Sequence, residues 1–76
     1  MTDHYLECRK QAMDLLEEIK VKASEGDDEV AHACEDDLKE YALKEIRRGL
    51  LNKDQCIEIS SIALSSNDIE FSRWYA

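Results

Sequence analysis

Two histidine–cysteine pairs have the residue types and the spacing for metal chemistry. His4 and Cys8 stand four positions apart, which places both side chains on one face of a helix, and imidazole and thiolate are both zinc ligands. His32 and Cys34 are only two positions apart, so on a helix their side chains diverge. Cys8 and Cys34 also fall on apolar stripes, where a free cysteine packs as a small hydrophobe. We therefore predict that these thiols belong to the core and that the chain holds neither a metal nor another cofactor.

The remaining side chains form no recognisable catalytic arrangement. His4 and His32 are the only candidates for a base at neutral pH, and neither stands beside a nucleophile motif. The two glycines are 23 positions apart, which excludes a glycine-rich phosphate loop. The acidic residues lack the Asp-x-Asp-x-Asp-Gly spacing of a calcium loop. The sequence therefore predicts a protein without enzyme activity and without catalytic residues.

The elements that position these residues are helices. The chain has 76 residues, no proline and two glycines, and its apolar residues recur at steps of three and four, the period of an α-helix. A chain of this length forms one domain at most and buries only about 60% of its unfolded surface. We predict a single all-α domain over residues 1–76, a small bundle of three helices plus a short C-terminal fourth helix. The expected helices span residues 3–24, 28–48, 53–65 and 68–75.

Start and stop signals support these boundaries. Gly26 ends the first expected helix. Asn52 with Gln55 three positions later is a capping box, in which each side chain bonds the backbone N–H of the other residue. Asn67 with Glu70 repeats this spacing at the start of the fourth expected helix.

Apolar residues in the last third of the chain allow two interpretations. Those of residues 53–65 are spread around the helix, so this helix is either central in the fold or shared with another chain. Phe71, Trp74 and Tyr75 share one face of the fourth expected helix. Large aromatic side chains usually close a core. The same three residues would otherwise be an anchor for a partner or the seam of a homodimer.

The negative charge is concentrated in the first half of the chain. The net charge is −8, and residues 1–38 carry twelve acids against four bases, so the whole excess lies there. Residues 25–37 contain seven acids and no lysine or arginine. A solvated helix face that keeps the protein soluble explains such a run, and so does a surface that meets a basic groove on another protein.

Our hypothesis takes the second explanation: a binding module or inhibitor whose rigid row of carboxylates mimics nucleic acid and blocks a nucleic-acid-handling partner. Glu29, Asp36 and Glu40 follow helical spacing and are expected to share a flank. The predicted partner-binding acids are Asp27, Asp28, Glu29, Glu35, Asp36, Asp37 and Glu40, with Glu17 and Glu18 as a second patch.

Two alternatives remain. Residues 53–75 have the layout of a helix-turn-helix DNA-binding unit, but a −8 chain is repelled by phosphates, and the second helix of that unit would carry Asp68 and Glu70 against Arg73 alone. Direct binding of nucleic acid is therefore not favoured. The other alternative is a purely structural, homo-oligomeric helical subunit.

Size, acidity and expected helical content give the chain a general likeness to one class of proteins, carried mainly by the acidic run at residues 25–37. The chain resembles the small accessory proteins of phages and prophages, including anti-CRISPR and other anti-defence inhibitors. The resemblance implies stoichiometric inhibition of a host complex that handles nucleic acid. No apolar run approaches the ~20 residues that span a bilayer, and three widely spaced cysteines do not form a disulfide framework. We expect a cytoplasmic protein, in a bacterial host if it is phage-encoded, with no membrane contact.

Overall fold

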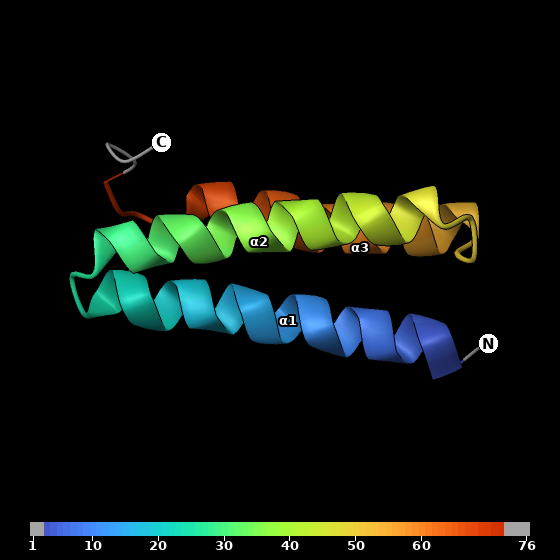
Figure 1. Cartoon of the computed structure of the whole chain (residues 1–76), viewed down its shortest axis with the longest axis horizontal. Helices are drawn as coiled ribbons and strands as arrows, with labels where there is room; N and C mark the ends of the chain where they lie inside the picture. Colours follow the sequence, from blue (N-terminus) through green and yellow to red (C-terminus); the bar gives the residue numbers. More distant parts are fainter. Residues whose placement is uncertain (1–2, 73–76) are drawn as a thin grey trace.

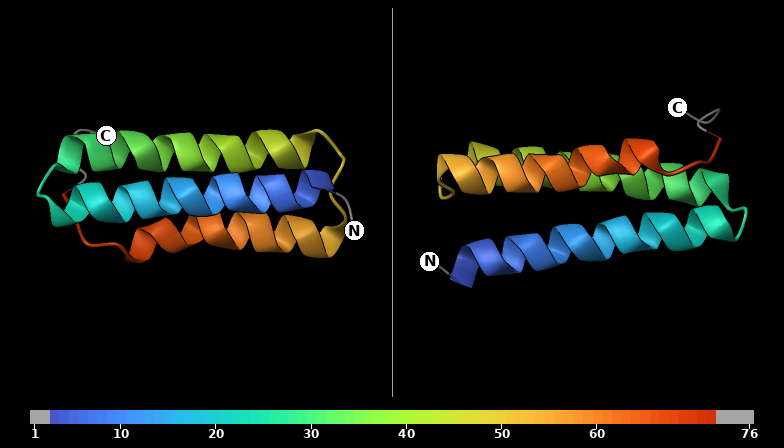
Figure 2. Two further views of the ribbon diagram at one scale, coloured as in Figure 1. Left: turned by 90° about the horizontal axis from the view of Figure 1, so that it is seen from below. Right: turned by 180° about the vertical axis from the view of Figure 1, so that it is seen from behind.

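The computed structural model describes residues 3–72 as three helices packed side by side (Figure 1). Helix α1 spans Asp3–Ser24, α2 spans Asp28–Arg47 and α3 spans Lys53–Ser65, followed by a short 3-10 helix, η1, at Ser66–Asp68. Successive helices run antiparallel, so the start of α1 lies beside the end of α2 (Figure 2). The long dimension of 38 Å is close to the ~33 Å length of a 22-residue helix. The prediction of an all-α bundle is confirmed.

The turns between the helices use the expected capping residues. Gly26 has φ +79°. Its N–H donates a hydrogen bond to the carbonyl of Ala23 at 3.1 Å, and the N–H of Asp27 donates one to the carbonyl of Lys22 at 2.9 Å. These two bonds are the Schellman arrangement that ends a helix with a left-handed residue. At the start of α3, Asn52 and Gln55 form both bonds of the capping box, at 2.8 and 3.0 Å. Both turns therefore follow from local sequence.

The core lies along the line where the three helices meet. Helix α1 contributes Ile19 and Ala12, α2 contributes Leu38, and α3 contributes Ile59, all with 0% exposure. Alanines recur on the buried faces and have no bulky side chain to hold the helices apart. Helix α3 is not central, however, since it buries only Ile59 and Ala63. Within the described residues, no helix combines the length and the apolar character needed to cross a membrane.

The predicted fourth helix is not present in the part of it that the structure describes. After η1, residues 69–72 are not helical, and Ile69 adopts an extended conformation with ψ 125°. The expected cap, Asn67, uses its side-chain oxygen differently, because Oδ1 accepts a hydrogen bond from Lys39 Nζ at 2.9 Å. Phe71 is half-buried and packs against the core. Trp74 and Tyr75, predicted as anchors beside it, lie outside the described residues.

Candidate functional site

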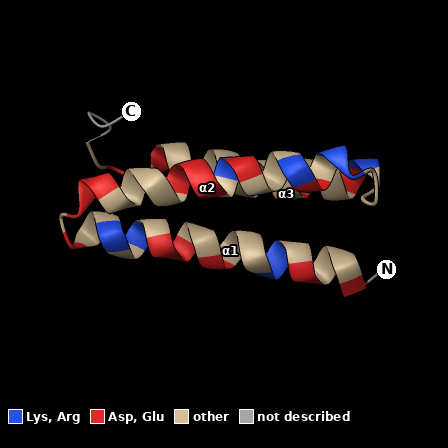
Figure 3. Ribbon diagram, in the orientation of Figure 1, with Lys and Arg blue, Asp and Glu red and all other residues tan. Residues whose placement is uncertain are grey.

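The antiparallel pairing of α1 and α2 brings the predicted acids together at one end of the bundle. Residues 17–40, from the second half of α1 to the middle of α2, carry ten acids against three lysines, so seven of the eight net negative charges lie in this segment. Figure 3 shows this acidic end at the α1–α2 turn, with lysine and arginine at the opposite end of α2. We call residues 17–40 the acidic end.

Cys34 on α2 lies within the electrostatic influence of both acidic patches. Its thiol is half-buried, and burial raises its pKa. The negative charge of Glu18 on α1 raises that pKa further, as do Asp37 and Asp27, whereas Lys22 opposes them. Carboxylates from α1, from α2 and from the turn between them therefore act on the pKa of one thiol.

Most of the predicted acids are exposed. Asp36 lies 3.4 Å from His32 Nε2, and Glu40 lies 3.7 Å from the Lys44 ammonium, which partly neutralises Glu40. Asp28 is half-buried, and Asp27 also caps α2 through the N–H of Val30. The exposed members of the predicted set are Asp27, Glu29, Asp36, Asp37, Glu40, Glu17 and Glu18.

Glu35 does not belong to this surface, and its predicted role as a partner contact is corrected. It is 2% exposed, and its Oε2 accepts a hydrogen bond of 2.8 Å from the hydroxyl of Ser66. The Lys39 ammonium lies 3.9 Å from the same oxygen. A buried carboxylate with these partners stabilises the contact between α2 and the end of α3, and it is not available to another protein.

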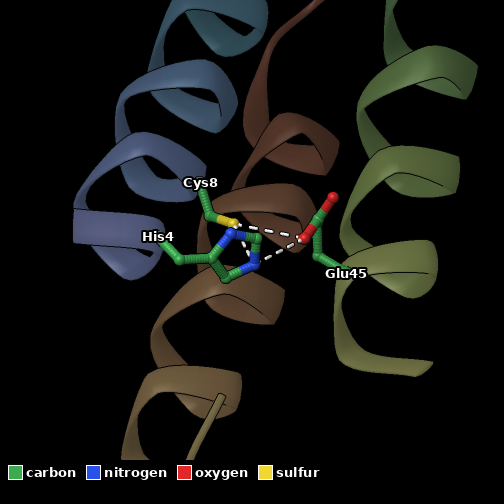
Figure 4. Close-up of side chains that lie close together, drawn as sticks. All are labelled: His4, Cys8 and Glu45. Atoms are coloured by element: carbon green, nitrogen blue, oxygen red, sulfur yellow. Dashed lines mark hydrogen bonds and ion pairs between the residues drawn. The ribbon is translucent and has the colours of Figure 1, made fainter. Parts of the chain in front are cut away.

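A second group of polar side chains lies at the opposite end of the bundle. His4 and Cys8 on α1 meet Glu45 from the last turn of α2 (Figure 4). His4 Nε2 is 3.1 Å from Glu45 Oε1 and 3.4 Å from Cys8 Sγ, and the thiol lies 3.3 Å from the same carboxylate oxygen. We call these three residues the His–Cys–Glu cluster. The sequence indicated only His4 and Cys8 as neighbours, because Glu45 is 37 positions from Cys8.

The surroundings hold this cluster in place. Arg48 Nη1 lies 3.3 and 3.4 Å from the two oxygens of Glu45. Burial raises the pKa of the Cys8 thiol, a hydrogen bond with Tyr41 opposes the increase, and the carboxylate of Glu45 adds to it. Burial also raises the pKa of Tyr41, and its hydrogen bond with Cys8 raises it further.

The cluster does not have the geometry of a cysteine nucleophile with its base. In such a triad the acid orients one imidazole nitrogen while the nucleophile meets the other. Here Cys8 and Glu45 both approach Nε2 of His4. Cys8 is also only 1% exposed. This arrangement converges three donor atoms on one point and keeps the sulfur away from a substrate.

An apolar groove runs between α2 and α3. It has a volume of about 250 Å³, and its walls include Leu43, Ile46 and Leu64. Leu43 is 68% exposed and Leu64 60% exposed, the highest values among the large apolar side chains described. Exposed apolar side chains that gather around one groove are typical of an interaction surface.

The burial of Glu35 and Glu45 could have been predicted from their spacing in the sequence, although both belong to a strongly charged helix. Ala31, Leu38 and Ala42 form the buried stripe of α2, and Glu35 and Glu45 continue it at steps of three and four. An acid at such a position is expected to have a buried partner. The partner itself depends on how the helices pack.

Comparison with protein-family models, with curated proteins and with solved structures finds no match to this chain.

Proposed function

We propose that this protein is a non-enzymatic binding protein whose acidic end engages a basic surface of another protein. The observation that carries the proposal is the concentration of seven net negative charges in residues 17–40, at the end of the bundle where α1 and α2 are joined (Figure 3). Helices α1 and α2 hold most of these carboxylates at fixed positions, so little ordering is needed on binding. A surface of this kind increases the rate of encounter with a positively charged partner and selects against acidic ones.

A partner that handles nucleic acid fits this surface best. Proteins that bind DNA or RNA place lysine and arginine where phosphates lie. Carboxylates on a rigid element occupy the same positions, and the protein then acts as a stoichiometric inhibitor. DNA and this protein would compete for one basic surface.

The test compares two charge-reversed variants with the same net charge. Asp36→Lys with Asp37→Lys changes the acidic end, and Glu7→Lys with Asp14→Lys changes exposed acids elsewhere on α1. Each variant has a net charge four units more positive than the wild type. The immobilised proteins are used to capture partners from a bacterial lysate at low salt and high salt, and captured proteins are identified by mass spectrometry.

We expect the wild type and the Glu7/Asp14 variant to capture the same partner, and the Asp36/Asp37 variant to lose it while its helical circular dichroism is unchanged. Added duplex DNA should release the partner from the wild type. Equal capture by both variants, or capture that withstands high salt, would contradict the proposal.

A second candidate function is self-assembly, which the apolar groove favours. Two copies that bury the exposed Leu43 and Leu64 of each groove against each other would remove apolar surface from water at about 25 cal/mol per Å². We expect Leu64→Lys to abolish any dimer seen by sedimentation equilibrium. Leu6→Lys, at a comparably exposed site on α1, is the matched control. A monomer at high concentration would rule out this function.

The helix-turn-helix alternative has less support. Its first helix would be α3, but residues 69–72 after η1 are not helical. Arg73, the cation on which DNA contact would depend, lies outside the described residues.

A further inference from the structure

The sequence predicted no metal, but the structure adds Glu45 to the pair of His4 and Cys8. We propose that these three residues form a zinc-binding site that joins the start of α1 to the end of α2. The site lies at the far end of the bundle from the acidic end, and it is independent of the proposed binding function. Its three donors are imidazole nitrogen, thiolate sulfur and carboxylate oxygen, all of which zinc binds in proteins.

The distances between the donor atoms match a face of a zinc tetrahedron. With bonds of about 2.3 Å to sulfur and about 2.0–2.1 Å to nitrogen and oxygen, tetrahedral angles separate sulfur from the other donors by about 3.5 Å and those two by about 3.3 Å. The observed separations are 3.4 Å for Cys8 Sγ to His4 Nε2, 3.3 Å for Cys8 Sγ to Glu45 Oε1, and 3.1 Å for His4 Nε2 to Glu45 Oε1. Each differs from the tetrahedral value by no more than roughly 0.3 Å.

The charges and the surroundings also suit a divalent cation. A Cys8 thiolate and the Glu45 carboxylate together balance the charge of Zn²⁺, and the Cys8 proton is released on binding. Arg48 Nη1 lies 3.3 Å from Glu45 Oε2, the oxygen that the metal would not use, and 3.4 Å from Oε1, so this guanidinium would keep its bond to Oε2 and turn away from Oε1 when the metal binds. A hydrogen bond of this kind orients a ligating carboxylate. The Arg48 side chain is 54% exposed, so its guanidinium can keep a position toward solvent.

The fourth coordination position has a route to solvent. The His4 side chain is 29% exposed, whereas Glu45 is 11% exposed and Cys8 is buried on the core side. Water can therefore reach a metal along the His4 edge. A site with three protein ligands and one water is an accepted zinc geometry.

Cobalt is the probe for the test, because tetrahedral Co²⁺ bound to a thiolate has strong visible bands and a near-ultraviolet charge-transfer band, whereas aqueous Co²⁺ absorbs only weakly in the visible and Zn²⁺ does not absorb there. The full chain, freed of metal with a chelator, is titrated with Co²⁺ and then with Zn²⁺. We expect one cobalt per chain, a thiolate-to-cobalt band, and loss of both signals when zinc displaces the cobalt.

Variants locate the site. Cys8→Ser and His4→Ala should each weaken cobalt binding by at least about a hundredfold, and Glu45→Gln by at least about tenfold. Loss of a residue that only supports a metal ligand already costs about 10- to 100-fold in affinity, and these three residues are the proposed ligands. Cys34→Ser, Cys56→Ser and His32→Ala are the matched controls and should bind cobalt as the wild type does. Circular dichroism of the metal-free variants shows which of them fold, and the three ligand variants give three separate tests.

Thermal unfolding supplies a readout that does not depend on colour. Zinc should raise the Tm of the wild type and of the controls but leave that of His4→Ala unchanged, because a metal that binds only the folded chain stabilises it. The proposal is overturned if no thiolate band appears, or if the band survives Cys8→Ser and disappears in Cys34→Ser or Cys56→Ser.

Discussion

The hydroxyl of Ser66 in η1 donates a hydrogen bond of 2.8 Å to Oε2 of Glu35 in α2, and both residues are buried. The same hydroxyl lies 2.9 Å from the carbonyl of Ala63. This contact links two segments 31 positions apart and fixes the end of α3 against α2. It also explains why an acid in the middle of an acidic run faces inward.

Ser66→Ala should therefore destabilise the fold. It removes a hydrogen bond to a buried carboxylate, which costs about 1.5–3 kcal/mol of unfolding free energy. Urea denaturation followed by circular dichroism measures the loss. Ser61→Ala, at an exposed position of α3, is the control and should change stability by less than about 0.5 kcal/mol. Equal stability of the two variants would show that Glu35 needs no bond from Ser66.

The alkylation rate of Cys34 should depend on acids from both helices. Burial and the negative charges of Glu18, Asp37 and Asp27 raise its pKa above the ordinary value of 9.0. Because only the thiolate reacts, the rate with iodoacetamide should rise with a midpoint above pH 9. Asp37→Lys or Glu18→Lys removes a negative charge and adds a positive one, so it lowers the pKa and increases the rate at pH 8.

Peptide mass spectrometry measures the modification of Cys34 separately from the other two cysteines. Glu7→Lys, at an exposed acid on α1 outside the acidic end, should leave the rate unchanged. A rate that falls, or that responds equally to Glu7→Lys, would mean that the charges of the two patches do not set the pKa of Cys34.

The capping box at the start of α3 should contribute measurably to the free energy of unfolding. The Asn52 side chain accepts the N–H of Gln55 at 2.8 Å, and Asn52→Ala leaves this N–H without that partner. We expect a loss of about 1 kcal/mol, measured by urea denaturation. Lys53→Ala, at the next residue and also exposed, keeps the cap and should be close to neutral. A loss of the same size in both variants would assign the effect to the helix and not to the cap.

The sequence correctly predicted those helix boundaries that interactions between nearby residues determine. The ranges expected for the first and third helices agree with α1 and α3, and α2 ends one residue before the predicted position. These boundaries depend on glycine and on capping residues within a few positions of each helix end. The fourth helix was predicted by the same reasoning and is not confirmed, since residues 69–72 are not helical and the side-chain oxygen of Asn67 accepts a hydrogen bond from Lys39, 28 positions away.

In the candidate sites, too, contacts between residues far apart in the sequence could not be predicted. The two acidic patches were visible as charge runs, but their joint effect on the pKa of Cys34 depends on the pairing of α1 with α2. His4 and Cys8 were visible as a pair on one helical face, and the third donor, Glu45, comes from the other helix. Spacing along one helix predicts which side chains share a face, whereas the packing of helices decides which faces meet.

The two ends of the bundle carry opposite net charge. The acidic end holds seven of the eight net negative charges, while residues 44–53 at the other end of α2 carry four bases and one acid. In a bundle 38 Å long and 19 Å or less across, this separation is a large permanent electric dipole along the long axis. The field of a positively charged surface exerts a torque on such a dipole before contact and turns the α1–α2 tip forward. Encounter with a basic partner of the kind proposed would therefore be oriented end-on within the range of the field, about 8 Å at physiological ionic strength.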